Sequence, residues 1–146
     1  MSYHYKYPRL ALTVDIIVFL KEKEEVKILL IQRGRYPFEG KWALPGGFVD
    51  MDETIENTAI RELKEETGLS KVELKQFHTF SAIGRDPRGR TVSVVFYGFT
   101  DSDNCKIKGD DDARDAKWFS INNIPELAFD HNEIIEMALN KFISNH

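Results

Sequence analysis

The chain has 146 residues, of which 42% are hydrophobic and 30% charged, as expected for one globular domain with a sizeable core. Its formal net charge of −4 argues against general nucleic-acid binding, which uses a basic face. Cys105 is the only cysteine, which excludes an internal disulfide and a cysteine-rich metal site and favours a reducing, cytoplasmic setting.

Residues 1–9 contain three alternating tyrosines and lack the apolar segment of a signal peptide. This tail could be loosely ordered, or it could add an edge strand or contact a partner subunit in a homodimer. Residues 10–20 and 26–32 are rich in branched apolar side chains and predict two strands that pair as an antiparallel hairpin. The longest apolar run, residues 16–20, is too short to span a membrane.

The segment 33–42, RGRYPFEGKW, is predicted to be a loop, and loops on a rigid scaffold often carry binding residues. Arg33 stands at the end of a strand and could reach a phosphate group. Trp42 and Phe38 could form a wall for a flat ring, although aromatic side chains at such a place also belong to cores.

A helix is predicted to follow Gly47, over about residues 53–67. Asp50 or Asp52 would supply its N-cap, because a short acceptor side chain there binds the first free backbone N–H groups. Gly68 would end the helix in the left-handed conformation that glycine adopts without strain.

Three carboxylates, those of Glu62, Glu65 and Glu66, fall on one side of this helix within an arc of about 100°. The arc overlaps the edge of the apolar stripe, and like charges three or four residues apart each cost about 0.2–0.5 kcal/mol. Sequence selected for helix stability alone would avoid this arrangement. It therefore predicts a bound divalent cation, with a solvated acidic face as the alternative.

Residues 72–82 and 91–100 predict a second hairpin. Residues 86–89, Asp-Pro-Arg-Gly, fit a type I turn between the two strands. Arg85 and Arg88 flank or belong to this turn and could bind phosphate or ribose oxygens, since arginine makes bidentate contacts with phosphate. Their alternative role is that of a solvated turn.

The acidic segment 101–115 is predicted to be a loop, and 116–120 a short strand. Asp130 would cap an amphipathic closing helix, at whose start His131 could either pack or touch a ligand. Strands before and after the central helix, with a second helix at the end, indicate an α+β sandwich in which helices cover both faces of a mixed sheet. No internal boundary divides residues 1–146 into further domains.

The spacing of the glycine, glutamate and arginine residues between positions 47 and 69 matches the motif of one known protein family. Gly47, five residues, Glu53, seven residues and then REUxEExGU over residues 61–69, with U aliphatic, fill every fixed position of the Nudix box. The lead-in from Arg33 and the acidic loop before Trp118 resemble the same family, so the resemblance covers most of the chain. It implies a Nudix-type α/β/α sandwich with a mixed β-sheet as a single domain.

Nudix hydrolases cleave nucleoside diphosphates linked to another moiety, so the resemblance implies this reaction with two to three Mg²⁺ or Mn²⁺ ions. The metal ligands that it implies are Gly46 through its carbonyl group, Glu62, Glu65 and Glu66. Arg61 would pair with Glu53 or Glu65 and hold the carboxylates in place. The general base would be a glutamate of this helix or an acid of the late loop, with Asp111 or Asp112 preferred as base or metal ligand.

Residues 78–90 and 127–131 resemble the bacterial and archaeal ADP-ribose pyrophosphatases. The resemblance implies hydrolysis of ADP-ribose, a small-molecule nucleotide, to AMP and ribose 5-phosphate. The residues expected to contact it are Arg33, Trp42, Arg85 and Arg88. Two alternatives stay open: hydrolysis of oxidised nucleoside triphosphates, and an ADP-ribose-sensing domain like those of certain transcriptional regulators. The intact box, and a chain with no room for a DNA reader, favour catalysis over sensing.

Overall fold

A computed structural model describes residues 4–107 and 116–143 of the chain. Within these residues the elements follow one another as β1 (Ala11–Glu22), β2 (Glu25–Gln32), β3 (Trp42–Ala43), β4 (Gly46–Phe48), α1 (Ile55–Thr67), β5 (Lys75–Phe80), β6 (Thr91–Thr100), β7 (Ala116–Ser120) and α2 (His131–Phe142). Neither α1 nor α2, the two helices of the described part, is long and apolar enough to cross a membrane.

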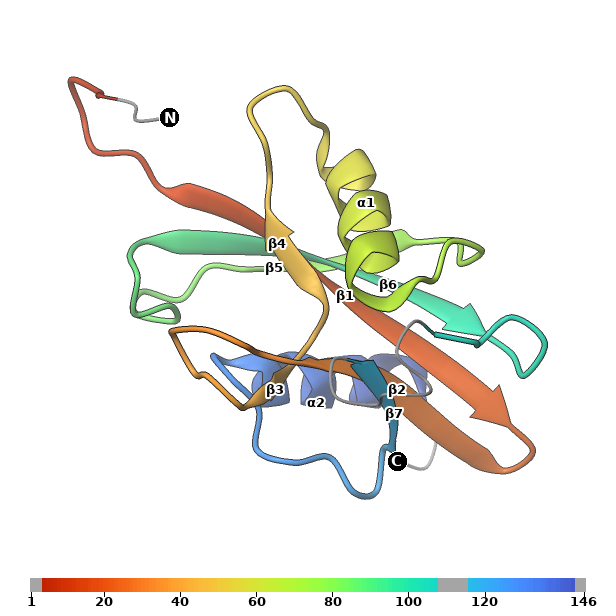
Figure 1. The fold of residues 1–146 in the computed structure, drawn as a ribbon. Helices are drawn as coiled ribbons and strands as arrows, with labels where there is room; N and C mark the ends of the chain where they lie inside the picture. Colours follow the sequence, from red (N-terminus) through yellow and green to blue (C-terminus); the bar gives the residue numbers. More distant parts are fainter. Residues whose placement is uncertain (1–3, 108–115, 144–146) are drawn as a thin grey trace.

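The strands form one mixed sheet around β1, in the order β3-β2-β1-β6-β5 (Figure 1). β1 pairs in parallel with β6 over ten residues, from Ala11 opposite Thr91 to Leu20 opposite Thr100. It pairs antiparallel with β2 and with β4, and β7 adds to β2. The two predicted hairpins, β1–β2 and β5–β6, are confirmed, and the parallel β1–β6 contact makes the sheet mixed.

The two faces of the sheet carry separate apolar cores, because successive side chains of a strand point to opposite faces. Val14, Ile16 and Val18 pack on the face that α1 covers, whereas Ile17 and Phe19 pack on the face that α2 covers. Figure 1 shows α1 and α2 on opposite sides of the sheet. The predicted α/β/α sandwich is therefore confirmed.

The strand predicted over residues 72–82 is shorter in the structure, where β5 begins at Lys75. The preceding residues cross closely over Gly98 of β6, where a side chain would collide with Val72 and with the carbonyl oxygen of Glu73. Val72 and Leu74 pack against the core on the α1 face. Residues 72–74 thus cross over β6 without pairing with it, and the pairing begins at Lys75.

The N-cap of α1 is neither Asp50 nor Asp52, so that prediction is wrong. Thr54 has the extended backbone of a cap, and its Oγ1 accepts a hydrogen bond of 3.1 Å from the N–H of Asn57. The C-terminal prediction is confirmed, since Gly68 follows the helix with φ of 84°.

Candidate active site

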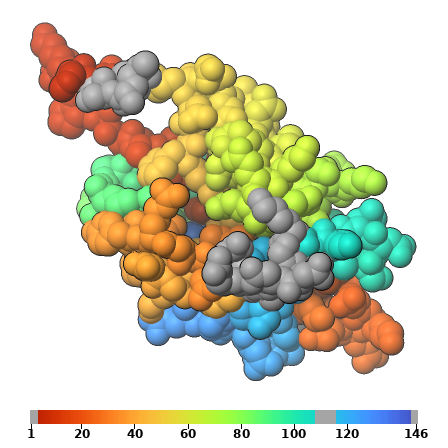
Figure 2. Space-filling view, in the orientation of Figure 1, coloured from red at the N-terminus to blue at the C-terminus, as the bar shows by residue number. Residues whose placement is uncertain are grey.

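A cavity of about 530 Å³ lies between the loop after β2, β4, α1, the turn before β6 and the start of α2. Figure 2 shows it as a hollow between the orange loop that follows β2 and the yellow-green residues of α1. The predicted site residues that line it are Arg33, Gly46, Glu62, Glu66, Arg85 and Arg88. Glu65, Arg61 and Trp42 are not among its lining residues. Asp110, Asp111 and Asp112 lie outside the described residues.

The two glycines of β4 let the backbone lie directly against the carboxylates of α1. A side chain at Gly47 would overlap the carboxylate of Glu62. One residue earlier, the N–H of Gly46 donates a hydrogen bond of 2.7 Å to Oε1 of Glu66. At Gly47 only glycine permits the approach to α1, and at Gly46 only glycine permits the approach to β1, so β4 and α1 position two carboxylates at one wall of the cavity.

Arg61 of α1 forms hydrogen bonds with three carboxylates and a longer ion pair of 3.7 Å with Asp50. Its Nε and Nη2 donate to Glu53 at 2.7 and 2.9 Å, and its Nη1 donates to Glu62 at 2.7 Å and to Glu65 at 3.1 Å. The hydrogen bonds from Arg61, helped by one from Thr58, lower the pKa of Glu53 to about 2. The geometry agrees with the predicted scaffold role of Arg61 and Glu53.

The carboxylates that face the cavity are partly buried from solvent and repel one another. Burial, with the nearby charges of Glu62 and Asp15, raises the pKa of Glu66 to about 8. Burial also raises the pKa of Glu62, although Arg61 opposes that shift. Carboxylates that are held together at such a cost favour a positive ion beside them.

The donor set fits a hard divalent cation, although not as three convergent side chains. Glu65 turns towards Arg61 with 60% of its side chain exposed. Among the described residues no three His, Cys, Asp or Glu side chains converge on a ready-made metal position. Mg²⁺, however, typically binds one or two carboxylates and completes its shell with water and substrate phosphate. Glu62 and Glu66 supply that number of carboxylates at the cavity wall.

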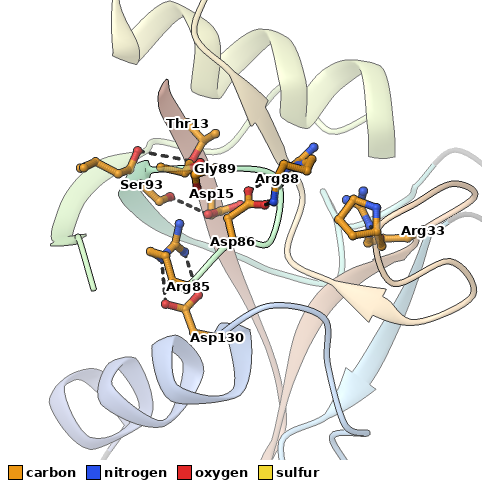
Figure 3. A network of polar contacts seen from close by, with 12 residues as sticks. Thr13, Asp15, Arg33, Arg85, Asp86, Arg88, Gly89, Ser93 and Asp130 are labelled. Carbon is orange, nitrogen blue, oxygen red and sulfur yellow. Dashed lines mark hydrogen bonds and ion pairs between the residues drawn. The ribbon is translucent and has the colours of Figure 1, made fainter. Parts of the chain in front are cut away.

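Two of the cavity arginines already have carboxylate partners (Figure 3). Arg85, with 5% of its side chain exposed, makes bonds of 2.9 and 2.7 Å to the two oxygens of Asp130. This pairing explains why Asp130 precedes α2 without a capping side-chain bond. Arg88 makes bonds of 3.1 and 2.8 Å to Asp86, which outweigh burial and lower the pKa of that carboxyl. Both arginines therefore hold the cavity wall together.

Arg33 has no such partner. Its Nε donates a hydrogen bond of 2.6 Å to the carbonyl oxygen of Pro37, and no carboxylate of the described residues forms an ion pair with it. Burial and the neighbouring charge of Arg88 lower its pKa, so its positive charge is under-compensated. Figure 3 shows it apart from the paired arginines. Arg33 is thus the cavity arginine best placed to receive an anion.

The aromatic wall of the cavity differs from the predicted one. Trp42 packs edge-on against Phe119, with ring centroids 4.9 Å apart, in the core on the α2 face. Phe48 and Phe129 line the cavity instead, and the guanidinium of Arg88 lies 4.8 and 5.4 Å from their ring centroids. Phe129 has φ of 55°, a left-handed conformation that is uncommon for an aromatic residue and that sequence does not reveal.

Asp15 is a cavity residue that sequence reasoning missed. It lies on β1 between the fully buried Val14 and Ile16, and it accepts a hydrogen bond of 2.5 Å from Ser93 of β6. A signal was available, because an aspartate inside an apolar strand is rarely buried without a partner or a task.

The chain matches a family model described as NUDIX domain over residues 9–138. The ADP-ribose pyrophosphatase of Methanocaldococcus jannaschii is 47% identical over 126 residues, which are 86% of this chain and 71% of that protein. The ADPR-responsive transcriptional repressor NtrR of Acinetobacter baylyi is 35% identical over 138 residues, or 90% of this chain and 54% of the repressor. The chain thus spans about half the length of the repressor.

A solved structure is also similar over nearly its whole length. The NUDIX domain of Shewanella oneidensis NrtR, determined in complex with ADP ribose, has a TM-score of 0.82 and 34% identity, and the match covers 95% of this chain and 93% of that one. The family model covers most of the chain and includes the complete motif between Gly47 and Leu69. The chain belongs to the NUDIX domain family.

Proposed function

We propose that this chain is a Nudix pyrophosphohydrolase that cleaves ADP-ribose to AMP and ribose 5-phosphate with the help of divalent metal ions. The observation that carries the proposal is one cavity that combines the α1 carboxylates with the under-compensated charge of Arg33. A diphosphate with bound cations needs carboxylates to bind the cations and a positive side chain to bind the phosphate oxygens. The 47% identity to an ADP-ribose pyrophosphatase and the 34% identity to a NUDIX domain solved with ADP ribose support this choice of substrate.

Arg33 would bind the diphosphate, since a guanidinium forms charge-assisted, bidentate hydrogen bonds with phosphate oxygens. Phe48 and Phe129 would provide the flat wall for adenine, in place of the expected Trp42. Phe38 packs edge-on against Phe129, with the ring centroids 4.9 Å apart. The main role of Arg85 and Arg88 would be to stabilise the cavity wall through their ion pairs. They could also donate hydrogen bonds to the substrate.

Glu62 and Glu66 would hold Mg²⁺ or Mn²⁺, with the Gly46 carbonyl as a further oxygen donor. Bound there, the cation would neutralise the diphosphate and activate water. Arg61 fixes the orientation of Glu62, and the Gly46 N–H fixes that of Glu66. Glu65 would join a second or third ion only by leaving Arg61, to which it is bonded at 3.1 Å.

The general base is proposed to be a carboxylate, with two candidates. Glu66 lines the cavity, where its carboxylate would accept a proton from the attacking water. Asp112, or Asp111 beside it, is the alternative from the acidic loop. Asp112→Asn should lower kcat with little change in metal affinity if the loop supplies the base, whereas an unchanged kcat would leave Glu66.

The substrate is tested with a panel assayed by product: ADP-ribose, other nucleotide sugars, NADH, diadenosine polyphosphates and oxidised nucleoside triphosphates. ADP-ribose should give the highest kcat/KM and yield AMP and ribose 5-phosphate in equal amounts. A clear preference for a triphosphate, with release of pyrophosphate, would overturn the ADP-ribose assignment while leaving the metal site in place.

The metal site is tested with Glu66→Gln, read both as turnover and as Mn²⁺ binding by calorimetry. The variant should lose most of its activity and bind Mn²⁺ at least about tenfold more weakly, because one charged ligand is lost. Glu56→Gln is the matched control, since Glu56 is an exposed residue of the same helix outside the cavity lining. Unchanged Mn²⁺ binding by Glu66→Gln would contradict the assignment of Glu66 as a metal ligand.

A sensing function is the second candidate, and the similarity to an ADPR-responsive repressor is the observation that favours it. A sensor would bind ADP-ribose without turning it over. Tight binding by calorimetry together with no product in the presence of Mg²⁺ or Mn²⁺ would therefore select sensing over hydrolysis.

Homodimer formation stays a prediction that light scattering of the purified chain can test. Tyr5 and Tyr7 of the tail are exposed. A dimer that becomes a monomer when residues 1–9 are deleted would assign the contact to this tail.

A further inference from the structure

Asp15 is a buried carboxylate for which the proposed metal chemistry gives no role. It is 8% exposed and sits on β1 between side chains that are fully buried. Ser93 donates to its Oδ2 at 2.5 Å (Figure 3). Its Oδ1 faces Gly46, where a Cβ would lie 2.6 Å away. One oxygen is therefore fixed by β6, while the other lies at the cavity floor beside a residue with no side chain.

His131 adds a fixed hydrogen-bond donor beside this oxygen. Its Nδ1 accepts a hydrogen bond of 3.0 Å from the backbone N–H of Leu44, so the proton of the neutral ring lies on Nε2. Burial lowers the pKa of this imidazole and favours the neutral form. The ring cannot rotate to exchange its nitrogens without breaking the Leu44 bond.

The Nε2–H of His131 lacks a hydrogen-bond acceptor within the described part of the chain. Its nearest carboxylate oxygen is Oδ1 of Asp15 at 3.6 Å, which is beyond hydrogen-bond distance. Only 4% of the His131 side chain and 12% of the Asp15 side chain are exposed, yet both residues line the cavity. Among the described residues, Oγ1 of Thr100 is the only buried side-chain nitrogen or oxygen without a hydrogen-bond partner, so the Nε2–H of His131 is open to the cavity, where a ligand atom can accept its hydrogen bond.

A donor and an acceptor side by side match one kind of ligand group. A hydroxyl donates one hydrogen bond and accepts others, so it can bridge Asp15 and His131. A phosphate would meet the negative charge of Asp15, and a cation would meet the Nε2–H of His131 and the nearby guanidinium of Arg85. Of the sugar and phosphate groups of a nucleotide sugar, only the sugar hydroxyls satisfy both partners.

We propose that Asp15 and His131 bind a sugar hydroxyl of the substrate and so select sugar-bearing diphosphates. This inference rests on the proposed hydrolase function and adds a specificity element to the same cavity. Ser93 is a positioning residue, because it holds Asp15 without being among the residues that line the cavity.

The test compares ADP-ribose with two hydroxyl-free analogues. One carries 2′,3′-dideoxyadenosine in place of adenosine, and the other carries tetrahydrofurfuryl alcohol in place of the terminal ribose. The wild-type chain should use one of them with kcat/KM about 10- to 100-fold below that for ADP-ribose, the range for a hydrogen bond to a charged group. Equal use of all three compounds would overturn the inference.

Two variants locate the effect. Asp15→Asn removes the charge, and His131→Asn keeps a side-chain oxygen near the Leu44 N–H while it removes Nε2. Each should lower kcat/KM for ADP-ribose by about 10- to 100-fold and leave the discriminated analogue within about threefold of wild type. The same loss on both compounds would mean that Asp15 and His131 support the fold or the metal site only.

Ligand binding without turnover provides a second readout. Calorimetry with ADP-ribose in the presence of EDTA should show at least about tenfold weaker binding by Asp15→Asn and His131→Asn. Thr100→Val, a buried change on the same strand as Ser93 but outside the cavity lining, should bind and turn over like wild type. Thermal unfolding confirms that each variant is folded.

The two proposals fail in different ways. Absence of turnover on every diphosphate would reject the hydrolase function, and the binding comparison would still decide the hydroxyl site. Normal hydrolysis of ADP-ribose with unchanged binding in both variants would reject the hydroxyl site alone.

Discussion

At the residue scale, the arginines of the cavity differ in the groups that compensate their positive charge. Arg85 and Arg88 each bind a carboxylate, while the Nε of Arg33 is bonded to a carbonyl oxygen. Arg33→Ala should therefore raise KM for ADP-ribose about 10- to 100-fold and change kcat less, because a charge-assisted hydrogen bond contributes about 1.5–3 kcal/mol. Steady-state kinetics measure this, with the exposed Arg90→Ala as control. A fall in kcat at constant KM would contradict the binding role.

Alanine substitutions at the adjacent Gly46 and Gly47 should affect different properties, stability in the first case and activity in the second. The methyl group of Gly47→Ala would meet the carboxylate of Glu62, the mobile end of a side chain, so the fold should survive and activity should fall at least tenfold. The methyl group of Gly46→Ala would meet the backbone carbonyl of Val14 on β1, which cannot move, so stability should fall. Melting temperature and kcat/KM measured on both variants separate the effects. Equal melting temperatures would contradict this reading.

At the element scale, the brace between Glu53 and Arg61 fixes the segment that leads into α1. Because the folded-state pKa of Glu53 is about 2, below its ordinary value near 4.3, the brace stabilises the fold fully above about pH 4.5. This contribution is lost as the pH falls from about 4.5 towards 2. The difference in unfolding free energy between wild type and Glu53→Gln, measured in urea, should be largest near pH 6 and shrink steadily as the pH falls towards 2. A constant difference across that range would contradict the assignment.

The elements themselves were largely predictable, because each depends on local sequence. Residues rich in valine and aromatic side chains predicted β6, Trp118 with Phe119 predicted β7, and Gly68 marked the end of α1. The error at the start of α1 arose because Thr54 stood among several acceptable capping residues. Asp130 was placed correctly before α2, but its carboxylate binds Arg85, a contact between residues 45 positions apart that local signals do not report.

At the scale of the whole molecule, the cavity joins segments that are remote in sequence. The motif of α1 identified Glu62 and Glu66, because their spacing alone carries the chemistry. Asp15 and His131 are 116 positions apart and meet only because β1 and the start of α2 adjoin the same cavity. Trp42 was expected at the cavity because of its place in the loop 33–42 and the family resemblance, but in the structure it packs against Phe119. Tertiary contacts of this kind cannot be read from local patterns.

β1 lies at the centre of both cores, and its amides are therefore expected to be the most protected of the sheet against hydrogen exchange. Its residues from Val14 to Leu20 are buried, and it pairs with β2, β4 and β6, so its amides can open only when the molecule unfolds globally. β5 is an edge strand of the described sheet with mostly exposed side chains and pairs with β6 alone. Hydrogen exchange followed by NMR or mass spectrometry should show the amides of β1 exchanging roughly 100-fold or more slowly than those of β5. The protection of β1 should follow the free energy of unfolding measured in urea. If β5 were protected as long as β1, the edge would have to be covered in solution, and the dimer predicted for this chain would become the first explanation to test.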